Sequence, residues 1–401
     1  MLADVQDGLG PFLAIYLLSS QHWQPGRIGI VMTISGFATV LARPPVGSLI
    51  DRITWKRELI VVAAAIIGVS VMVMALVPQF WPVAIFQGIT GAANSVFPPA
   101  LAAITLGIVG QKAFTRRIGR NESFNHGGNA FTAIAAGLTG YLIAQVAVLW
   151  VIAALAGASI VAALRLHGDD IDNELASGRT EGNSNADAAS GGLWALLRNR
   201  NLLIFSACIT LFHFANAAML PILGEKLSRG DPRFSSLFIS ACIITAQIVM
   251  VPVAALVGRK ADAWGRKPLF LVGFAALPIR GVLYTLVDSP YLSVAIQILD
   301  GIGAGTFFVL FFIVVEDLTR GTGRYNLAQG VTSAAWGFGA ALSNTVAGYI
   351  VQLAGFDAAF LFLAACAGAA FLLFLFAMPE TGTRETATPP ADDTTSVQAP
   401  A

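Results

Sequence analysis

The sequence predicts an all-α, polytopic membrane protein with twelve transmembrane helices in two pseudo-symmetric bundles of six. Three observations lead to this prediction. Of the 401 residues, 56% are hydrophobic and only 12% are charged, whereas a typical soluble domain has about 25% charged residues. Apolar runs of membrane-spanning length recur along the whole chain. A single polar segment divides these runs into two sets of six.

Each predicted helix is an apolar run of about 20 residues, the length that crosses the hydrocarbon core of a bilayer. Because backbone groups in lipid must be satisfied within the segment, such runs are expected to be helical. Eleven complete runs are present, at residues 28–50, 57–78, 81–107, 123–147, 148–166, 200–224, 234–257, 268–287, 290–315, 325–352 and 354–378.

A twelfth and shorter run opens the chain and ends near Leu18. Its apolar part begins only at Gly8, after two aspartates, Asp4 and Asp7. The sequence therefore predicts a first helix that is incomplete at its N-terminus. The alternative is a short first helix that is anchored by its own terminus.

The composition changes at residue 167, where the chain becomes rich in Gly, Ser, Asn and Asp. Such a composition is typical of a flexible linker, and the Thr-, Pro- and Ala-rich end of the chain is typical of disorder. We therefore expect four parts: an N-terminal six-helix bundle at residues 1–166, a flexible cytoplasmic linker at 167–199, a C-terminal six-helix bundle at 200–378 and a disordered cytoplasmic tail at 379–401.

The distribution of Lys and Arg predicts the orientation in the membrane. With the linker in the cytoplasm, eighteen of these residues fall in cytoplasmic segments and four in outer loops. Both termini are then cytoplasmic, in a plasma membrane of the bacterial inner-membrane type. Six of the seven tryptophans lie near a predicted membrane boundary, and Trp336 alone lies deep in a span.

Several classes of protein are disfavoured. The net charge of +1 gives no reason to expect a nucleic-acid partner. The four histidines are scattered and the three cysteines lie singly in apolar runs, so no metal or cofactor is expected. No phosphate-binding loop is recognisable, which argues against ATP-driven transport. We expect a monomer that is not an enzyme. It is expected to contact the lipid bilayer and to bind a small-molecule substrate.

Two loops of similar sequence follow the second helix of each half. The first runs from Gly47 through Asp51 and Arg52 to Lys56 and Arg57, and the second runs from Gly258 through Asp262 and Gly265 to Arg266 and Lys267. We call them the signature loops. Glycine lets helices approach closely, and a carboxylate at a helix end can pair with a cation or a helix N-terminus. We therefore predict a cytoplasmic gate; the alternative is that these charges only follow the positive-inside rule.

The signature loops resemble the G-x-L-a-D-r-x-G-r-k motif of the major facilitator superfamily, and the resemblance covers essentially the whole chain. It implies a transporter fold of two six-helix bundles. The two loops depart from the motif at Thr54 and Lys260. Many proton-coupled members carry Arg where this chain has Ala84, and the Gly-Pro signature of many drug exporters is missing near Gly137. These departures leave the coupling ion and the direction of transport undecided.

Polar side chains at membrane depth are costly and are therefore candidates for function. They occur in pairs, spaced so that each pair shares a helix face, in the first, fourth, seventh and tenth spans: Asp4 and Asp7, Gln87 and Asn94, His213 and Asn216, and Gln297 and Asp300. The resemblance implies that these four helices line the central cavity. Alternatively, the amides bond neighbouring helices and His213 is a neutral, packed side chain.

Two further groups are secondary candidates. Polar residues open the fifth span on the predicted cytoplasmic side, where they could form a substrate mouth or only cap and pack the helix: Glu122, Asn125, His126 and Asn129. Arg43 and Arg280 lie within spans, where each could neutralise a buried carboxylate or extend to an interface.

The sequence therefore predicts a secondary active transporter of a small organic solute that works by alternating access. A buried carboxylate needs a partner or a proton, so proton coupling is expected. Efflux is slightly favoured over uptake. The alternatives are an uptake carrier for a metabolite or siderophore-like compound, and a membrane sensor that binds a solute without transporting it.

Overall fold

The computed structural model describes residues 9–176, 198–320 and 324–382, in which all regular structure is helical. In chain order the elements are α1 (Leu9–Ile15), the π-helix η2 (Tyr16–Ser20), α2 (Pro25–Arg52), α3 (Lys56–Leu76), α4 (Phe80–Asn94), α5 (Phe97–Leu142), α6 (Gln145–Leu164), η3 (Gly168–Asp170), α7 (Asn173–Ala176), α9 (Arg200–Ala217), α10 (Met219–Ser228), α11 (Pro232–Trp264), α12 (Arg266–Leu286), α13 (Pro290–Ile296), α14 (Ile298–Thr319), α15 (Tyr325–Ala354) and α16 (Phe356–Ala377).

The spans predicted from hydropathy are present as helices. Within the described residues, nine helical stretches are long and apolar enough to cross a membrane. Three of these stretches combine consecutive elements, namely α4 with the start of α5, α9 with α10, and α13 with α14. Residues 111–142 and α15 add two further long helices, and Gly10–Ser20 forms a short apolar one. The fold is the predicted one of twelve helices.

Helix α5 is kinked at Gly110, where two helical stretches meet. This residue has φ 68° and ψ 170°, a conformation that glycine adopts without strain. Residues 111–122, which the sequence predicted to lie between the fourth and fifth spans, are helical. The next turn, at Ile143 and Ala144, comes slightly earlier than the predicted boundary between residues 147 and 148.

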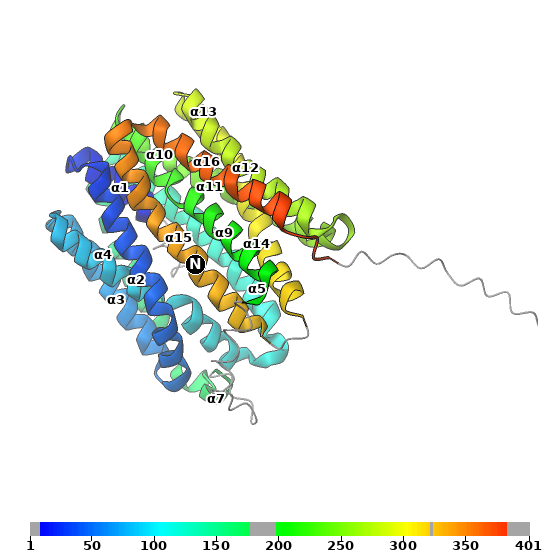
Figure 1. Cartoon of the computed structure of the whole chain (residues 1–401). Coiled ribbons are helices and arrows are strands. Elements are labelled where there is room, and N and C mark those ends of the chain that lie inside the picture. The colour runs from blue at the N-terminus through cyan, green and yellow to red at the C-terminus, as the bar shows by residue number, and fades with distance from the viewer. Residues whose placement is uncertain (1–8, 177–197, 321–323, 383–401) are drawn as a thin grey trace, which may run out of the picture.

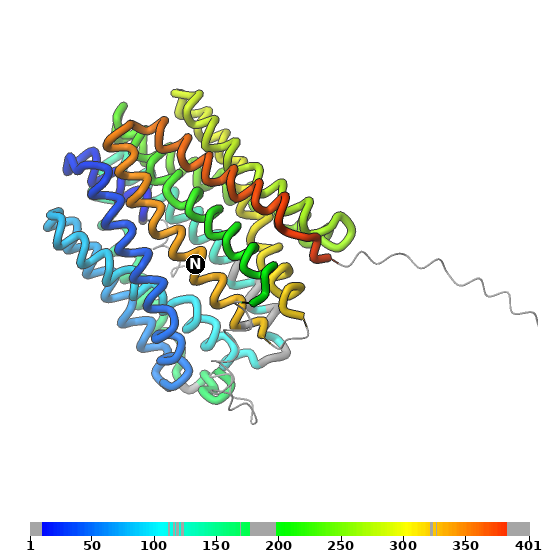
Figure 2. The backbone as a smooth tube through the Cα atoms, in the orientation of Figure 1, coloured from blue at the N-terminus to red at the C-terminus, as the bar shows by residue number. Residues whose placement is uncertain are grey.

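The two halves repeat one packing arrangement. In the N-terminal half α2 packs on α4, and α3 packs on α6. In the C-terminal half the corresponding helices do the same, since α11 packs on α14 and α12 packs on α16. Figures 1 and 2 show the halves as a blue-to-cyan group and a green-to-red group of long helices. This is the pseudo-symmetric pair of bundles that the repeated signature loops predicted.

Helices α2 and α15 form the first seam between the halves, and they run side by side in Figure 1. The backbones are close, because a Cβ atom added at Gly29 would lie 2.2 Å from the carbonyl oxygen of Asn344. Thr33 Oγ1 donates to the carbonyl of Ala341 at 2.6 Å, and Thr345 Oγ1 donates to Thr33 Oγ1 at 2.7 Å. Small and hydroxyl-bearing residues thus join these helices, as is typical within membranes.

Helices α5 and α11 form the second seam. Ser240 Oγ donates to the carbonyl of Ala133 at 2.6 Å. Gln145, at the start of α6, accepts a hydrogen bond from Ser236 Oγ and donates one to the carbonyl of Pro232, both at 2.5 Å. Gln145 is buried, so its side chain forms a buried polar contact between the halves.

The first seam lies away from the end of the bundle that carries the signature loops, which we call the basic end. On α2 the contacts with α15 run from Gly26, which bonds Gln352, to Val40, which meets Gly337. Beyond Val40, towards the basic end, most of the α2 residues from 41 to 49 are exposed. The described contacts between α2 and α15 therefore hold the halves together at the opposite end.

Gln145→Leu is expected to loosen the opposite end. The change removes one partner from each of two polar groups, the hydroxyl of Ser236 and the carbonyl of Pro232. A buried group that loses its partner costs about 1–3 kcal/mol. Hydrogen–deuterium exchange of the peptide 232–240 should become about tenfold faster or more. Gln79→Leu, at an exposed position, is the control. An unchanged exchange rate in Gln145→Leu would show that the hydrogen bonds of Gln145 do not hold this end closed.

The segment predicted as a flexible linker starts with ordered structure. Residues 168–176 form η3 and α7 and dock on α5, where Asp172 N donates to the carbonyl of Gly107 at 3.2 Å. Ile171 and Ala176 are buried in this contact region. The first residues of the predicted linker therefore form short helical elements, because these apolar side chains pack on α5. The remainder of the linker, 177–197, lies outside the described residues.

The first residues of the predicted tail are also ordered. Glu380 accepts hydrogen bonds from the backbone N–H groups of Arg266 and Lys267, at 2.9 and 3.1 Å. A carboxylate at the N-terminus of α12 is favoured by the helix dipole and by the unpaired N–H groups there. Residues 383–401 of the predicted tail lie outside the described residues.

Candidate functional site

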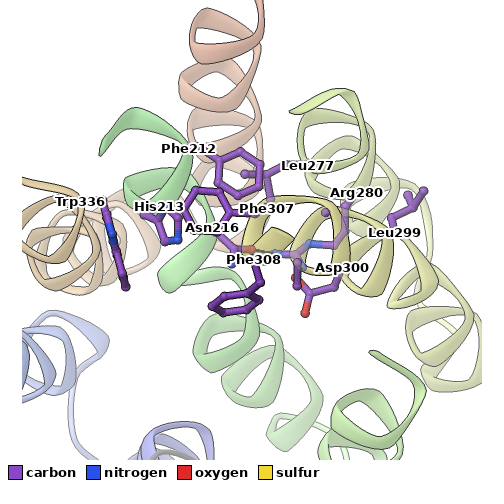
Figure 3. A pocket seen from close by; sticks show the side chains of 12 residues that line it. Phe212, His213, Asn216, Leu277, Arg280, Leu299, Asp300, Phe307, Phe308 and Trp336 are labelled. Atoms are coloured by element: carbon purple, nitrogen blue, oxygen red, sulfur yellow. Dashed lines mark hydrogen bonds and ion pairs between the residues drawn. The ribbon is translucent and has the colours of Figure 1, made fainter. Parts of the chain in front are cut away.

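A buried ion pair lies near the middle of the C-terminal half. Arg280 on α12 exposes only 2% of its surface, and its guanidinium is ion-paired with Asp300 on α14 through Nη1. Nη2 donates to Asn216 Oδ1 on α9 at 2.5 Å. The same guanidinium also contacts the sulfur of Met219, at 3.2 and 3.4 Å. Three helices thus meet at one charged group (Figure 3).

Helix interruptions place these polar side chains. The seventh span breaks at Ala218, directly after the turn that carries Asn216. The tenth span breaks at Gln297, so Asp300 falls in the first turn of α14.

The ion pair borders a first cavity of about 200 Å³. Five of the twelve residues that line it carry an aromatic ring. The lining residues, most of them labelled in Figure 3, are Phe212, His213, Asn216, Leu277, Arg280, Leu299, Asp300, Gly303, Ala304, Phe307, Phe308 and Trp336. The ring of His213 lies 4.3 Å from that of Trp336 and 4.4 Å from that of Phe307, measured between centroids. Such a cavity can receive a flat ring.

A second cavity of about 300 Å³ lies on the other side of the same polar group. It is lined by residues of both halves, namely Gly10, Pro11 and Met32 from α1 and α2, and Asn216, Ala217, Leu220, Pro221, Arg280 and Asp300 from the C-terminal half. Asn216, Arg280 and Asp300 line both cavities. The ion pair therefore stands between an aromatic pocket and the interface of the halves.

Four of the predicted site residues come together here. Asn216 and Asp300 belonged to the predicted cavity set, and so did His213, which lines the aromatic cavity. Arg280 was a secondary candidate with two alternative predicted roles. In the structure it is paired with a buried carboxylate and does not extend to an interface.

Other members of the predicted cavity set lie elsewhere. Gln297 is buried and accepts a hydrogen bond from Tyr284 at 2.5 Å, so it joins the tenth span to α12 rather than lining either cavity. Gln87 is buried on α4, and on the same helix Asn94 Oδ1 is a buried acceptor with no hydrogen bond among the described residues. Asp4 and Asp7 lie outside the described residues.

The secondary candidates on the fifth span contribute to a seam between the halves. His126 Nδ1 lies 3.0 Å from Gln247 Oε1, across the boundary between α5 and α11. Asn125 and Asn129 lie on the same helix and are half-buried. The side chain of Glu122 lies outside the described part of the structure. Arg43 is exposed on α2, towards the basic end.

The two signature loops differ in their contacts. In the first loop Lys56 is buried, and its Nζ donates to the carbonyl of Ile53 at 2.6 Å and to Asn173 Oδ1 of α7 at 3.4 Å. Asp51 and Arg52 are exposed at the end of α2. Gly47 has no atom within 4 Å of an added Cβ.

In the second loop Arg266 holds two carboxylates, Asp262 at 2.9 Å and Asp317 at 3.0 Å. Asp317 also pairs with Arg320 at 3.0 Å, and the neighbouring Glu316 bonds the same arginine, which raises the pKa of Arg320. Gly265 has φ 89°, which favours glycine at the turn into α12. Gly258 and Lys267 lie at the ends of the two helices that this turn joins, α11 and α12. Of the predicted gate residues, Asp262 and Arg266 thus belong to one charge network at the basic end, together with Asp317, Arg320 and Glu316.

Sequence reasoning missed the aromatic wall and one buried carboxylate. Phe307 and Phe308 look like any lipid-facing residues in a hydropathy profile, whereas Trp336 was marked by its depth. Glu225 on α10 is 3% exposed, and its Oε2 atom has no hydrogen bond among the described residues. Glu225 lies in the last turns of the seventh span, next to charged residues. The sequence therefore provided no reason to distinguish it from the charged residues of a loop.

Comparisons with known proteins agree with this architecture. The sequence model described as Major Facilitator Superfamily matches residues 3–277 and 233–400. Proteins of two Mycobacterium tuberculosis strains, both described as uncharacterized MFS-type transporters, are 52% identical to this chain over 380 residues, which cover 95% of this chain and 91% of each relative.

The fold is also similar to that of a solved transporter. A crystal structure of a variant of the nucleoside transporter NupG has a TM-score of 0.77 and 17% sequence identity, and the match covers 93% of this chain and 97% of that one. At this identity the likeness concerns the fold alone. Together with the matches in sequence, it shows that this multi-pass membrane protein belongs to the major facilitator superfamily, a family of transporters.

Proposed function

We propose that this protein is a secondary active transporter that carries a small organic solute by alternating access, coupled to protons. One observation carries the proposal: the Arg280–Asp300 ion pair with Asn216 is buried between two cavities, one of which is shared by the two halves. Transporters of this kind bind their solutes near the middle of the membrane, at the interface of the repeats.

The ion pair suggests how a proton and a solute could be linked. A buried guanidinium is tolerated because Asp300 neutralises it, and the loss of that partner is strongly unfavourable. If Asp300 takes up a proton, the solute loses the carboxylate that accepts its hydrogen bond, and Arg280 loses its counter-charge. Protonation and solute binding would then oppose each other, which is what exchange of the solute for protons requires.

The first seam, which joins the halves at the opposite end, supports a state in which the site is reached from the basic end. The Lys and Arg residues of the signature loops favour a cytoplasmic location for that end. We therefore place both termini in the cytoplasm and the protein, as a monomer without enzymatic activity, in a bacterial inner membrane. The mostly apolar cavity walls favour efflux over uptake, since exported solutes are commonly taken from an apolar phase.

Asp300→Asn is expected to abolish proton-driven transport while leaving membrane insertion intact. The amide keeps the shape of the carboxylate but can neither bind nor release the proton. Purified protein in proteoliposomes should show solute-dependent proton uptake with a panel of small organic solutes, and Asp300→Asn should lose it. Asp288→Asn, which changes a fully exposed side chain at the opposite end, is the matched control.

Two results would contradict this proposal. Full proton-coupled activity in Asp300→Asn would remove this carboxylate from the coupling step. Solute binding by the wild-type protein without any gradient-driven flux would favour the sensor instead, and net accumulation in the inward direction would favour an uptake carrier.

A further inference from the structure

The two cavities carry no net charge among the residues that the structure describes. Their ionisable lining residues are Arg280, Asp300 and His213. The first two neutralise each other. His213 is packed between aromatic rings, where a charged imidazolium would be poorly solvated. From this charge balance and the aromatic wall we infer the class of solute.

We propose that the solute is an electrically neutral molecule with a planar nitrogen-containing ring and a hydroxyl or amide group beside it. The proposal rests on the transporter function proposed above and specifies the solute for the same site. The ring would occupy the aromatic cavity, and the polar group would meet Asn216 and the ion pair.

The size and the walls of the aromatic cavity select a single small ring system. Its volume of about 200 Å³ lies below the range of about 300–1,000 Å³ for drug-sized ligand pockets. Rings from three helices face it, with Phe307 and Phe308 on α14, His213 on α9 and Trp336 on α15. Offset or tilted stacking on these rings favours a flat aromatic group over a saturated one of equal size.

The hydrogen-bonding groups of the wall favour nitrogen in that ring. His213 Nδ1 lies 3.0 Å from the carbonyl oxygen of Ile209. A carbonyl oxygen only accepts, so Nδ1 carries the hydrogen and Nε2 has the lone pair. On the facing helix, Trp336 Nε1 is a buried donor with no partner among the described residues. A ring with its own donor and acceptor can satisfy both, and leaving them unmet is unfavourable.

The polar end of the site disfavours a charged solute. The Nη1 and Nη2 atoms of Arg280 already donate to Asp300 and Asn216, so an anion finds no unpaired cation. A cation would approach a carboxylate that is already neutralised. Because the Asp300 side chain is 24% exposed, a hydroxyl or amide N–H of the solute can still donate to it.

The charge preference can be tested with a set of probes that share one ring. Purified wild-type protein in detergent would be titrated calorimetrically at neutral pH with quinolin-3-ylmethanol, quinoline-3-carboxylate, quinolin-3-ylmethanamine and decahydronaphthalen-2-ylmethanol. We expect the quinoline alcohol to bind most tightly. The carboxylate, the ammonium form and the saturated alcohol should each bind at least about tenfold more weakly, because each loses either charge compatibility or ring stacking.

Variants assign the binding to this cavity. Trp336→Leu should weaken binding of the quinoline alcohol by about tenfold. Phe376→Leu, at a position 80% exposed on α16, should change it less than twofold, a bound set by its distance from the site.

Three results would overturn the proposal: tighter binding of the carboxylate or the ammonium probe, equal binding of the saturated alcohol, or no binding of the quinoline alcohol up to low millimolar concentration. Calorimetric binding does not depend on transport. A charged solute that drives Asp300-dependent proton flux would therefore refute the proposed solute class and leave the transporter function standing. Binding of the neutral ring compound without any flux would support the solute class and refute the transporter function.

Discussion

Arg280→Gln is expected to destabilise the protein strongly and to abolish transport. The guanidinium is 2% exposed and is the counter-charge of Asp300. Removing one partner of a buried ion pair leaves the other charge without compensation, which costs about 3–5 kcal/mol in measured cases. The change also removes the donor to Asn216 Oδ1, so a second polar group at the same point loses its partner.

The double variant Arg280→Gln/Asp300→Asn separates stability from function. Because it removes both charges, it should recover most of the thermal stability in detergent that the single variant loses, while transport stays absent. Arg259→Gln, at an exposed position on α11, should leave the unfolding temperature near that of wild type. If Arg280→Gln unfolds like wild type, or if the double variant is no more stable than the single one, the pair does not hold this site together.

Gly29→Val is expected to prevent the halves from closing at the opposite end. A Cβ atom at this position would lie 2.2 Å from the carbonyl oxygen of Asn344, and backbone on that side cannot yield as a flexible side chain could. Neither helix can therefore keep its place in the first seam. The conformational equilibrium should shift away from the described arrangement, and transport should fall by more than about tenfold, because alternating access needs both states.

Distance measurements between spin labels can show this shift. Labels at Gln79→Cys and Asp288→Cys lie in exposed turns of the two halves at the opposite end. Their separation should increase in Gly29→Val. Gly157→Val on α6 is the matched control, since no atom lies within 4 Å of its added Cβ. An unchanged distance distribution with normal transport in Gly29→Val would contradict the role of this seam.

The predicted gate remains a prediction, and the structure sharpens what it involves. Each signature loop forms hydrogen bonds with the segment that follows its own bundle in the chain. Lys56 bonds Asn173 of α7 in one half, and Arg266 bonds Glu380 in the other. Both segments were expected to be flexible or disordered. They are ordered where they dock because the loop offers them unpaired backbone N–H groups or buried apolar surface.

The sequence by itself determined the number and the order of the spans, the internal repeat and the family. It could do so because a backbone in lipid must be helical over a fixed length, and because the charged loops stand out against apolar runs. It also singled out His213, Asn216 and Asp300, since polar groups at membrane depth are rare and costly. These signals are local and are read from composition and spacing.

Only the tertiary structure decided which of the polar residues meet. Arg280 reaches Asp300 from another helix, whereas Gln297, three residues from Asp300, turns to Tyr284 instead. Hydropathy cannot separate a phenylalanine that faces lipid from one that lines a cavity, because a hydropathy value depends on the residue type alone. The rotation and the tilt of each helix make that distinction, and they depend on close packing against neighbours from both halves of the chain.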